Sequence, residues 1–105
     1  MKRVSFKMYL KEGMEEEYVK RHNEIWPELQ KIITDQGVYD YSIFLDRETN
    51  ILFAVQKVKE GGADSQARDE TGIIQRWWDY MADIMEVNSD NSPKQKELVE
   101  VFYLE

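Results

Sequence analysis

The spacing of apolar residues alternates between two periods along the chain, and this alternation constrains the fold more than any other feature. Residues 3–10 carry apolar side chains at every second position, which is typical of a strand with one buried face. From Met14 onward the apolar positions recur every three or four residues, as on an amphipathic helix that ends near Gly37. Pro27 interrupts that stretch, so we predict two helical pieces that meet near residues 23–26.

The rest of the chain continues with the same two periods. A polar turn joins two segments with strand-like alternation, which predicts a β-hairpin. Two adjacent glycines then precede a second amphipathic stretch, and a polar loop precedes a last alternating segment. The expected elements are strands at 38–45 and 51–58, a helix at 73–85 and a strand at 98–104.

The predicted order of elements is strand, helix, strand, strand, helix, strand. This is the order of the α+β ferredoxin-like sandwich, in which two helices pack on one face of a four-stranded antiparallel sheet. The length of 105 residues suits a single domain spanning residues 1–105.

The expected strand at residues 51–58 is apolar on both faces, with Phe53 and Val55 on one side and Leu52 and Ala54 on the other. Because helices cover only one face of such a sheet, we expect the second face to be buried as well. The simplest cover is a second copy of the chain, which would give a homodimer of the dimeric α/β-barrel type. The alternative is a C-terminal segment that folds over this face.

Charge and composition exclude several classes of function. The chain has 14 Lys and Arg against 21 Asp and Glu, a net charge of −7, which disfavours nucleic acid and acidic membranes as partners. It has no cysteine and one histidine, which excludes a disulfide framework and the usual zinc sites. There is no phosphate-binding glycine-rich loop, so neither common nucleotide-binding motif is present. No signal-peptide pattern or membrane-length apolar run occurs, so the expected location is cytoplasmic.

His22 is the only histidine, and it follows Tyr18 by four residues on the apolar stripe. This spacing directs both side chains toward the sheet. Histidine exchanges protons readily near neutral pH, so His22 is a candidate acid or base. The alternative is a core histidine whose ring bonds to a backbone carbonyl.

A pair of adjacent tryptophans, Trp77 and Trp78, is the second unusual feature. Neighbouring helical positions point about 100° apart, so both indoles reach the core only across a wide apolar face. Indole rings stack on the C–H faces of a pyranose, and Tyr39 and Tyr41, expected on one strand face, are suited to bind its hydroxyls. The alternative is that these aromatic residues serve only as core packing.

Several motifs built from uncommon residues occur along the chain. They are RHN at 21–23 followed by IWPEL at 25–29, QRWW at 75–78, DNSP at 90–93 and EVFYL at 100–104. Together they resemble the L-rhamnose mutarotase family over essentially the whole chain, although residues 61–71 match the family pattern poorly.

The resemblance implies a cytoplasmic homodimer of ferredoxin-like subunits that interconverts the α and β anomers of L-rhamnose. It implies His22 as the catalytic proton donor, and it implies that the sugar is contacted by Tyr18, Tyr41, Trp77 and Trp78. The reaction opens and recloses the pyranose ring with acid–base help, so no metal or cofactor is implied.

Two other functions stay open from the residues alone. Dimeric ferredoxin-like proteins include small monooxygenases that work without a cofactor, and others that bind haem through a histidine. His22 among aromatic residues would suit either of them. A non-catalytic module with an aromatic groove would bind a sugar without changing the rate of anomer exchange.

Overall fold

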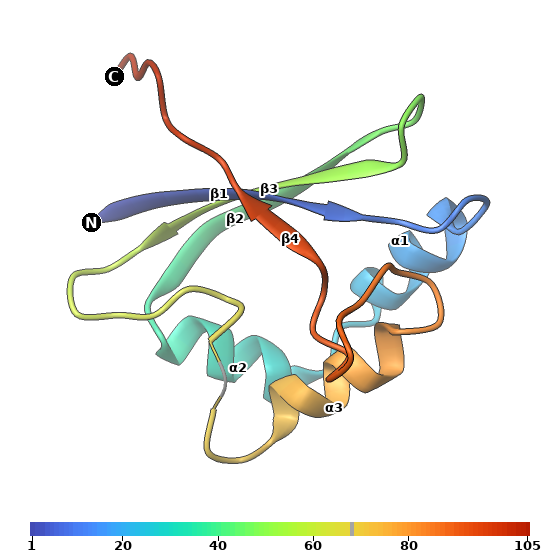
Figure 1. Cartoon of the computed structure of the whole chain (residues 1–105). Helices are drawn as coiled ribbons and strands as arrows, with labels where there is room; N and C mark the ends of the chain where they lie inside the picture. The colour runs from blue at the N-terminus through green and yellow to red at the C-terminus, as the bar shows by residue number, and fades with distance from the viewer. Residues whose placement is uncertain (68) are drawn as a thin grey trace.

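The structure, a computed structural model, describes residues 1–67 and 69–105. Figure 1 shows the elements in the described residues. In chain order they are β1 (Lys2–Tyr9), α1 (Glu15–Asn23), α2 (Pro27–Asp35), β2 (Val38–Asp46), β3 (Ile51–Val58), α3 (Ile73–Met81) and β4 (Gln95–Glu97).

The four strands form an antiparallel sheet in the order β2-β3-β1-β4. The three helices all lie on one side of this sheet, beneath it in Figure 1. The layering and the strand order confirm the predicted ferredoxin-like sandwich. The predicted break is also confirmed, because α1 ends at Asn23 and α2 begins at Pro27. Proline suits the first turn of a helix, where a backbone N–H has no partner within the helix.

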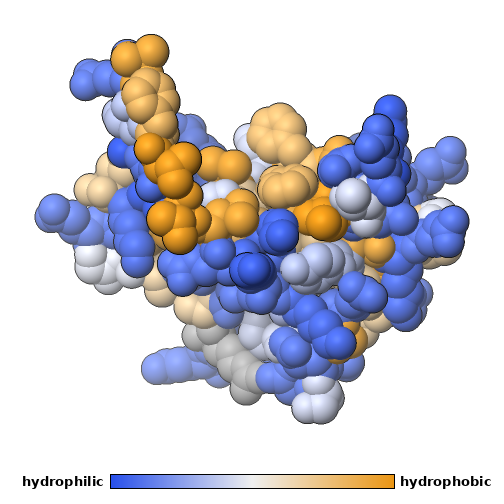
Figure 2. All heavy atoms as spheres, turned by 45° about the horizontal axis from the view of Figure 1, so that its top comes forward, coloured by the Kyte–Doolittle hydropathy of each residue, from blue (hydrophilic) through white to orange (hydrophobic). Residues whose placement is uncertain are grey.

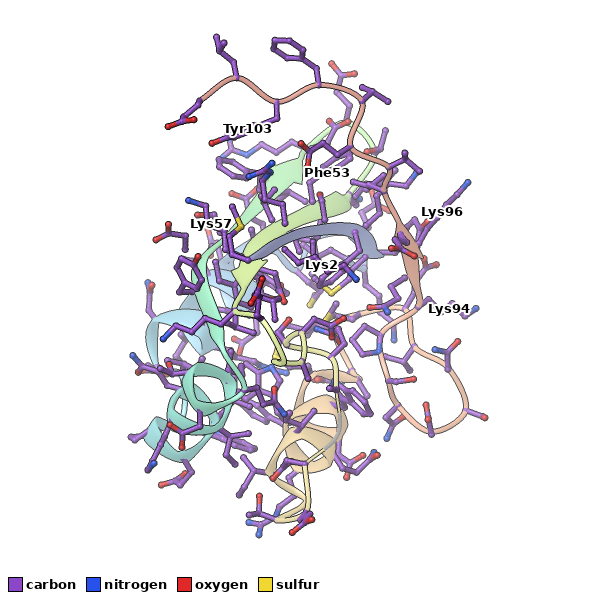
Figure 3. The ribbon with its side chains drawn as sticks, turned by 90° about the vertical axis from the view of Figure 1, so that its left-hand side faces the viewer. Lys2, Phe53, Lys57, Lys94, Lys96 and Tyr103 are labelled. Carbon is purple, nitrogen blue, oxygen red and sulfur yellow. The ribbon has the colours of Figure 1, made fainter. Side chains whose placement is uncertain are left out.

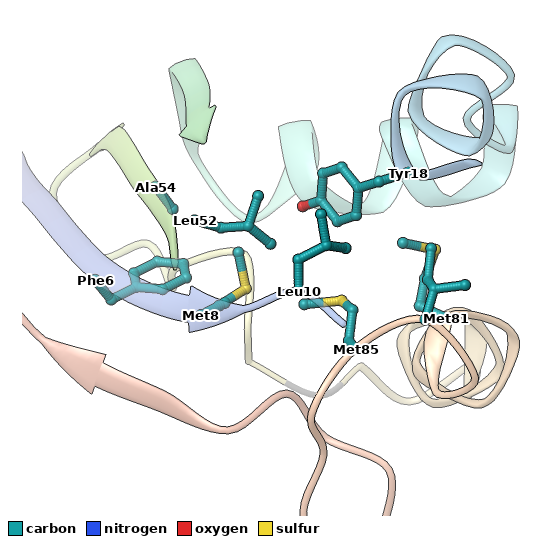
Figure 4. Close-up of a cluster of buried hydrophobic side chains, with 9 residues drawn as sticks. Phe6, Met8, Leu10, Tyr18, Leu52, Ala54, Met81 and Met85 are labelled. Carbon is teal, nitrogen blue, oxygen red and sulfur yellow. The ribbon is translucent and has the colours of Figure 1, made fainter. Parts of the chain in front are cut away.

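The core lies between the sheet and the helices. In the pairing of β1 with β3, Phe6 faces Ala54 and Met8 faces Leu52, and all four side chains are buried. The alternation predicted for residues 3–10 is therefore confirmed, with its apolar face against the helices. Figure 4 shows how further side chains from α1, α3 and the turn after α3 close this cluster, among them Tyr18, Met81 and Met85.

The prediction that Tyr39 and Tyr41 share one strand face is wrong. Asp40 has a positive φ of 48°, and the pairing of β2 with β3 shifts between Tyr39 and Ser42. A bulge of this kind adds one residue to the strand and reverses the side to which the following residues point. Tyr39 lies on the open face, where the Lys57 Nζ is 5.9 Å from its ring centroid, whereas Tyr41 packs against the core.

The strand predicted at residues 98–104 is also misplaced. β4 ends before this range and pairs with β1, and the last backbone bond of the ladder runs from the Leu98 N–H to the Ser5 carbonyl at 2.8 Å. Residues 99–105, the C-terminal arm, then leave the sheet (Figure 1). Alternating apolar residues form a strand when a surface buries one face, but Val101 in the arm is 93% exposed.

The helix predicted at residues 73–85 is shorter than its apolar pattern. α3 ends at Met81, while Ile84 and Met85 beyond it are still buried. A turn and an antiparallel bridge between Met85 and Leu10 return these side chains to the core. Each of α1, α2 and α3 has nine residues, and the described part of the chain holds no helix with the length and apolarity to cross a bilayer.

The sheet face opposite the helices, here called the open face, carries apolar side chains at its surface. Phe44 is 63% exposed and Val55 is 41% exposed, and Figure 2 shows a hydrophobic band beside the projecting arm. The arm reaches one end of this face, where the Arg3 guanidinium carbon is 3.6 Å from the ring centroid of Tyr103. Figure 3 shows Tyr103 on the same side of the sheet as Phe53. The sequence leaves open that a C-terminal segment covers the second face of the sheet. In the structure the arm covers only one end of that face.

Candidate functional site

A cavity of about 450 Å³ lies between the helices and the covered face of the sheet. Its lining includes Val19 and Asn23, both exposed, so it reaches the surface beside α1. Tyr39, on the open face, is not among its lining residues. The cavity brings together the five residues that the resemblance indicates, which are Tyr18, His22, Tyr41, Trp77 and Trp78.

His22 lies in the last turn of α1, half-buried on the cavity wall. Its Nδ1 is 3.1 Å from the Tyr18 carbonyl oxygen. A carbonyl only accepts, so Nδ1 carries the proton of the neutral ring and Nε2 has the lone pair. Burial lowers the pKa of His22, and the bond to the Tyr18 carbonyl opposes this more weakly. The ring therefore makes the carbonyl bond expected of a core histidine, yet it also offers the cavity a neutral imidazole.

Aromatic rings enclose His22 on two sides. Tyr18 stacks on it with ring centroids 4.2 Å apart and an interplanar angle of 27°. Trp77 meets it edge-on with ring centroids 5.5 Å apart. Trp77 in turn contacts Trp26 edge-on at 5.1 Å, so the indole that precedes α2 supports the site without lining the cavity. These contacts fix the plane of the imidazole and keep water from it, which is why its pKa is lowered.

Two tyrosine hydroxyls in the cavity wall stay protonated. Burial raises the pKa of Tyr18, and the neighbouring Tyr41 raises it further. Burial also raises the pKa of Tyr41, and a side-chain hydrogen bond with Ser65 partly offsets this. Both phenols therefore remain hydrogen-bond donors at neutral pH.

The two adjacent tryptophans have different surroundings. Trp78 is buried with Leu29 and Ile74 in a second core cluster, whereas Trp77 is half-buried and packs against both core clusters. Both indoles line the cavity. The wide apolar face of α3 thus supplies core packing and cavity wall from the same pair of residues.

Arg21, the neighbour of His22, is buried and ties α1 to the end of α3. Its Nε donates to a Glu17 carboxylate oxygen at 2.8 Å. Its Nη1 donates to the Tyr80 carbonyl at 2.7 Å and to an Asp83 carboxylate oxygen at 2.8 Å. The guanidinium carbon also lies 4.4 Å from the ring centroid of Tyr80. This clamp holds the turn that carries His22 against α3.

The sequence analysis does not select the polar residues that complete the cavity wall. Ser65 and Gln66 line the cavity, and they follow β3 in the chain. One signal for them is present in the sequence. Gln56 stands among the apolar residues that face the core from β3, and an amide there requires a polar partner.

The site offers acid–base chemistry and an aromatic surface. Within residues 1–67 and 69–105, no three His, Cys, Asp or Glu side chains come together as a metal site would require. The cavity presents one neutral imidazole, two phenolic hydroxyls, the Glu15 carboxylate, which is paired with Arg47, and mostly apolar lining residues. Such a wall can exchange protons with a hydroxylated ligand and pack against its apolar faces.

Comparisons with known proteins point the same way. The family model described as L-rhamnose mutarotase matches residues 3–104. A protein named L-rhamnose mutarotase from Phocaeicola vulgatus is 61% identical over 105 residues, with both chains fully covered. One of the same name from Bacteroides thetaiotaomicron is also 61% identical over 105 residues, again with full coverage of both.

A solved structure agrees in fold as well as in sequence. The crystal structure of an L-rhamnose mutarotase from Formosa agariphila matches with a TM-score of 0.89 and 50% sequence identity, covering all of both chains. The resemblance predicted from the motifs is confirmed by these matches. Because the family model covers nearly the whole chain and the relatives match it from end to end, the chain belongs to the L-rhamnose mutarotase family.

Proposed function

We propose that this protein is an L-rhamnose mutarotase, an isomerase that interconverts the α and β anomers of the sugar, with residues 1–105 acting as one domain. The observation that carries the proposal is the His22 imidazole on the wall of a cavity of about 450 Å³, with its Nδ1 bound to a carbonyl. Cavities of about 300–1,000 Å³ are typical of sites for small molecules. Membership of the family supports a monosaccharide as the ligand.

Ring opening requires one proton to leave the anomeric hydroxyl and one to reach the ring oxygen. The Nε2 atom of His22 has the lone pair to accept the first proton. The raised pKa values of Tyr18 and Tyr41 keep both phenols protonated at neutral pH, so they donate hydrogen bonds but transfer no proton. We therefore assign both transfers to His22, which is feasible because the two oxygens are bonded to the same carbon. The tyrosines orient the sugar.

Ring closure reverses these steps. The aldehyde rotates about the C1–C2 bond, so the C5 oxygen attacks the other face of the carbonyl. His22 takes the proton from that oxygen and donates one to the new anomeric hydroxyl, which leaves the imidazole neutral again. Every bond broken is remade and no electron is gained or lost. A positioned acid–base group of this kind contributes about 10²–10⁴-fold to the rate.

The aromatic wall supports a 6-deoxy sugar as the substrate. Trp77 and Trp78 present indole surface to the cavity, and Ile25 and Ile33 add aliphatic surface. Such a pocket favours the C6 methyl of L-rhamnose over a hydroxymethyl group. The discrimination is about 1–3 kcal/mol for one such group, so it produces a preference among related hexoses.

We also propose that two copies of the chain form a homodimer through the open face. Phe44 and Val55 on this face are exposed, and so are Val101 and Phe102 on the C-terminal arm. A second copy packed on the open face would bury these side chains, and two-fold symmetry would bury them twice. The cytoplasmic location expected from the sequence also stays a prediction, which cell fractionation would test.

Light scattering coupled to size-exclusion chromatography tests the homodimer. The wild type is expected to elute as a dimer, and Phe44→Lys is expected to shift it to the monomer. The control is Val19→Lys, because Val19 is 50% exposed on the helical side. A monomeric wild type, or an equal shift in both variants, would contradict the interface.

The proposed activity is tested by anomer exchange measured with saturation-transfer NMR of the anomeric protons. The panel is L-rhamnose, L-mannose, L-fucose and D-glucose. We expect the protein to accelerate exchange of L-rhamnose most and L-mannose, which shares its ring configuration, next. Sugar binding without faster exchange would indicate a binding module. A haem absorbance band, or oxygen uptake with quinols, would indicate the other dimeric ferredoxin-like activities.

A further inference from the structure

Gln56 is a polar side chain buried within an apolar layer. Its neighbours on the core face of β3, Leu52, Ala54 and Val58, are all apolar and buried. Gln56 itself has no exposed surface. A buried amide without partners destabilises the fold, so its hydrogen bonds show what it is there to hold.

Both ends of the Gln56 amide bind Ser65. The Ser65 backbone N–H donates to Gln56 Oε1 at 2.9 Å, and Gln56 Nε2 donates to Ser65 Oγ at 2.8 Å. The backbone N–H can only donate, so it identifies the amide oxygen and fixes the orientation of the amide. The NH₂ group then faces Ser65 Oγ, which has to accept. Gln56 therefore determines the direction of the hydrogen bond at the Ser65 hydroxyl.

The segment around Ser65 is held in place by further bonds. Gln66 N–H donates to an Asp64 carboxylate oxygen at 2.9 Å, and Ala63 N–H donates to the Gln36 carbonyl at 2.9 Å. Ser65 and Gln66 line the cavity as a result. The turn is thus built onto the core from β3 and from the end of α2.

Tyr41 lies in the stretch of β2 that passes Gln56, between the pairs Tyr39–Lys57 and Ser42–Val55, and it lines the cavity together with Ser65. The Ser65 hydroxyl beside the Tyr41 phenol lowers the pKa of Tyr41. Ser65 Oγ already accepts from Gln56, so its own proton is available to donate to the Tyr41 oxygen. Tyr41 then keeps its phenolic proton for a partner in the cavity. A hydrogen bond from Ser65 to Tyr41 would complete a chain that runs in one direction, from the Gln56 amide through the Ser65 hydroxyl to the Tyr41 hydroxyl and into the cavity.

We propose that Gln56 and Ser65 are positioning residues that make Tyr41 a hydrogen-bond donor to a hydroxyl oxygen of the bound sugar. This inference rests on the proposed function, because it takes Tyr41 as a sugar contact. It gives a role to Gln56 and Ser65, which the sequence analysis does not select. Neither residue takes part in proton transfer, so their effect falls on binding more than on turnover.

A double-mutant cycle tests this chain. Ser65→Ala and Gln56→Met are each made in the wild type and in Tyr41→Phe, and KM and kcat for L-rhamnose exchange are measured. Loss of one neutral hydrogen bond predicts that Ser65→Ala raises KM about three- to tenfold in the wild type, with a smaller change in kcat. In Tyr41→Phe the same substitution should change KM by less than about twofold, because the residue it acts through has lost its hydroxyl.

Two further variants separate positioning from folding. Ser65→Thr keeps the hydroxyl and should restore the wild-type KM. Ser5→Ala removes a serine hydroxyl that donates to the Ala54 carbonyl at 2.9 Å outside the cavity, and it should leave KM unchanged. Melting temperatures of all variants are recorded. A KM effect of Ser65→Ala that is equally large with and without the Tyr41 hydroxyl would overturn the proposal.

The dissociation constant for L-rhamnose, from quenching of tryptophan fluorescence, is measured over the same cycle. If exchange occurs but the effects are additive, the positioning role fails and the mutarotase function stands. If the wild type binds L-rhamnose without exchanging it, the function fails and the cycle in the dissociation constant still decides the role of Ser65. No binding and no exchange would overturn both.

Discussion

The two walls of the cavity differ in composition and in how they are held. The helical wall includes Tyr18, His22, Trp77 and Trp78, and the strand wall includes Tyr41, Ser65 and Gln66. One buried polar side chain secures each wall. Arg21 clamps α1 to the end of α3, and Gln56 fastens the turn at residue 65 to β3.

Arg21 and Gln56 differ in charge, and the difference follows from how exposed their partners are. Arg21 is buried, but the carboxylates it binds, Glu17 and Asp83, keep 40% and 68% of their side-chain surface exposed. Gln56 and Ser65 are both buried, and their partners lie in the core or in the cavity. Burying a charge costs far more than burying a paired amide. A charged clamp therefore suits the outer side of the helical wall, and a neutral amide suits the strand wall.

His22→Ala is expected to have the largest effect on activity. It tests whether proton transfer belongs to the helical wall, while the strand wall serves binding. Loss of the imidazole should lower kcat for anomer exchange about 10²–10⁴-fold, because proton transfer is then left to water. The melting temperature should change little, since His22 is only half-buried. Saturation-transfer NMR and thermal melts give the two readouts.

His22→Gln is the matched variant for this test. Its side chain keeps an N–H group but cannot exchange a proton near neutral pH. It should lose as much activity as His22→Ala. If His22→Gln keeps most of the wild-type kcat, the helical wall only orients the sugar, and the division between the walls fails.

The two tryptophans should separate stability from binding within the helical side of the cavity. Trp78→Ala removes a buried indole from the cluster with Leu29 and Ile74 and should lower the free energy of unfolding by about 3–5 kcal/mol. Trp77→Ala should cost less stability and weaken L-rhamnose binding more, because Trp77 is half-buried and contacts His22. Urea denaturation and fluorescence titration measure the two quantities. Equal losses of both quantities in the two variants would mean that the indoles share a single packing role.

Much of the helical wall can be predicted from the sequence because local spacing places it. Tyr18 and His22 are four residues apart on an apolar stripe, and Trp77 and Trp78 continue another stripe. The same periodicity predicts the order of the elements, and Pro27 itself predicts the break between α1 and α2. These features depend on short-range geometry, which a single chain displays directly.

The strand wall depends on contacts that no local pattern displays. The bulge at Asp40 is one residue with a positive φ, and it turns Tyr41 away from the face of Tyr39. Gln56 holds Ser65 at the cavity through two hydrogen bonds between residues that are far apart in the local pattern. The C-terminal arm fails as a predicted strand for a related reason, since its apolar alternation has no surface in this chain against which to pack.

Arg21→Met tests the clamp of the helical wall. The variant loses several hydrogen bonds to charged or carbonyl groups and should lower the free energy of unfolding by about 2 kcal/mol. It should also lower kcat, because the turn that carries His22 loses its tie to α3. Arg47→Met is the matched control, since Arg47 binds Glu15 through two hydrogen bonds on the exposed surface and should be nearly neutral. If both variants melt alike, the clamp has no special role.

The pH dependence of kcat/KM should be the smallest of these effects. It should come from His22 in the helical wall and from no residue of the strand wall. Burial lowers the pKa of His22, so the neutral imidazole persists somewhat below its ordinary value of about 6.5. The kcat/KM for L-rhamnose should therefore be level near pH 7 and fall only as the pH drops through this lowered pKa. His22→Gln should abolish this fall of kcat/KM at low pH. Ser65→Ala should raise KM and leave the pH at which the fall occurs unchanged.

The same shift has a consequence for stability, with a definite sign. The unfolded chain binds a proton at His22 at a higher pH than the folded chain does. The contribution of His22 is therefore complete above the unfolded pKa, and it is lost as the pH falls through the folded pKa. Thermal melts of the wild type and His22→Gln should coincide in their pH dependence above about pH 7 and diverge below it. An acid limb in kcat/KM at or above pH 6.5 would mean that the imidazole is solvated as in a free peptide, and the aromatic enclosure of the helical wall would then have no influence on its protonation.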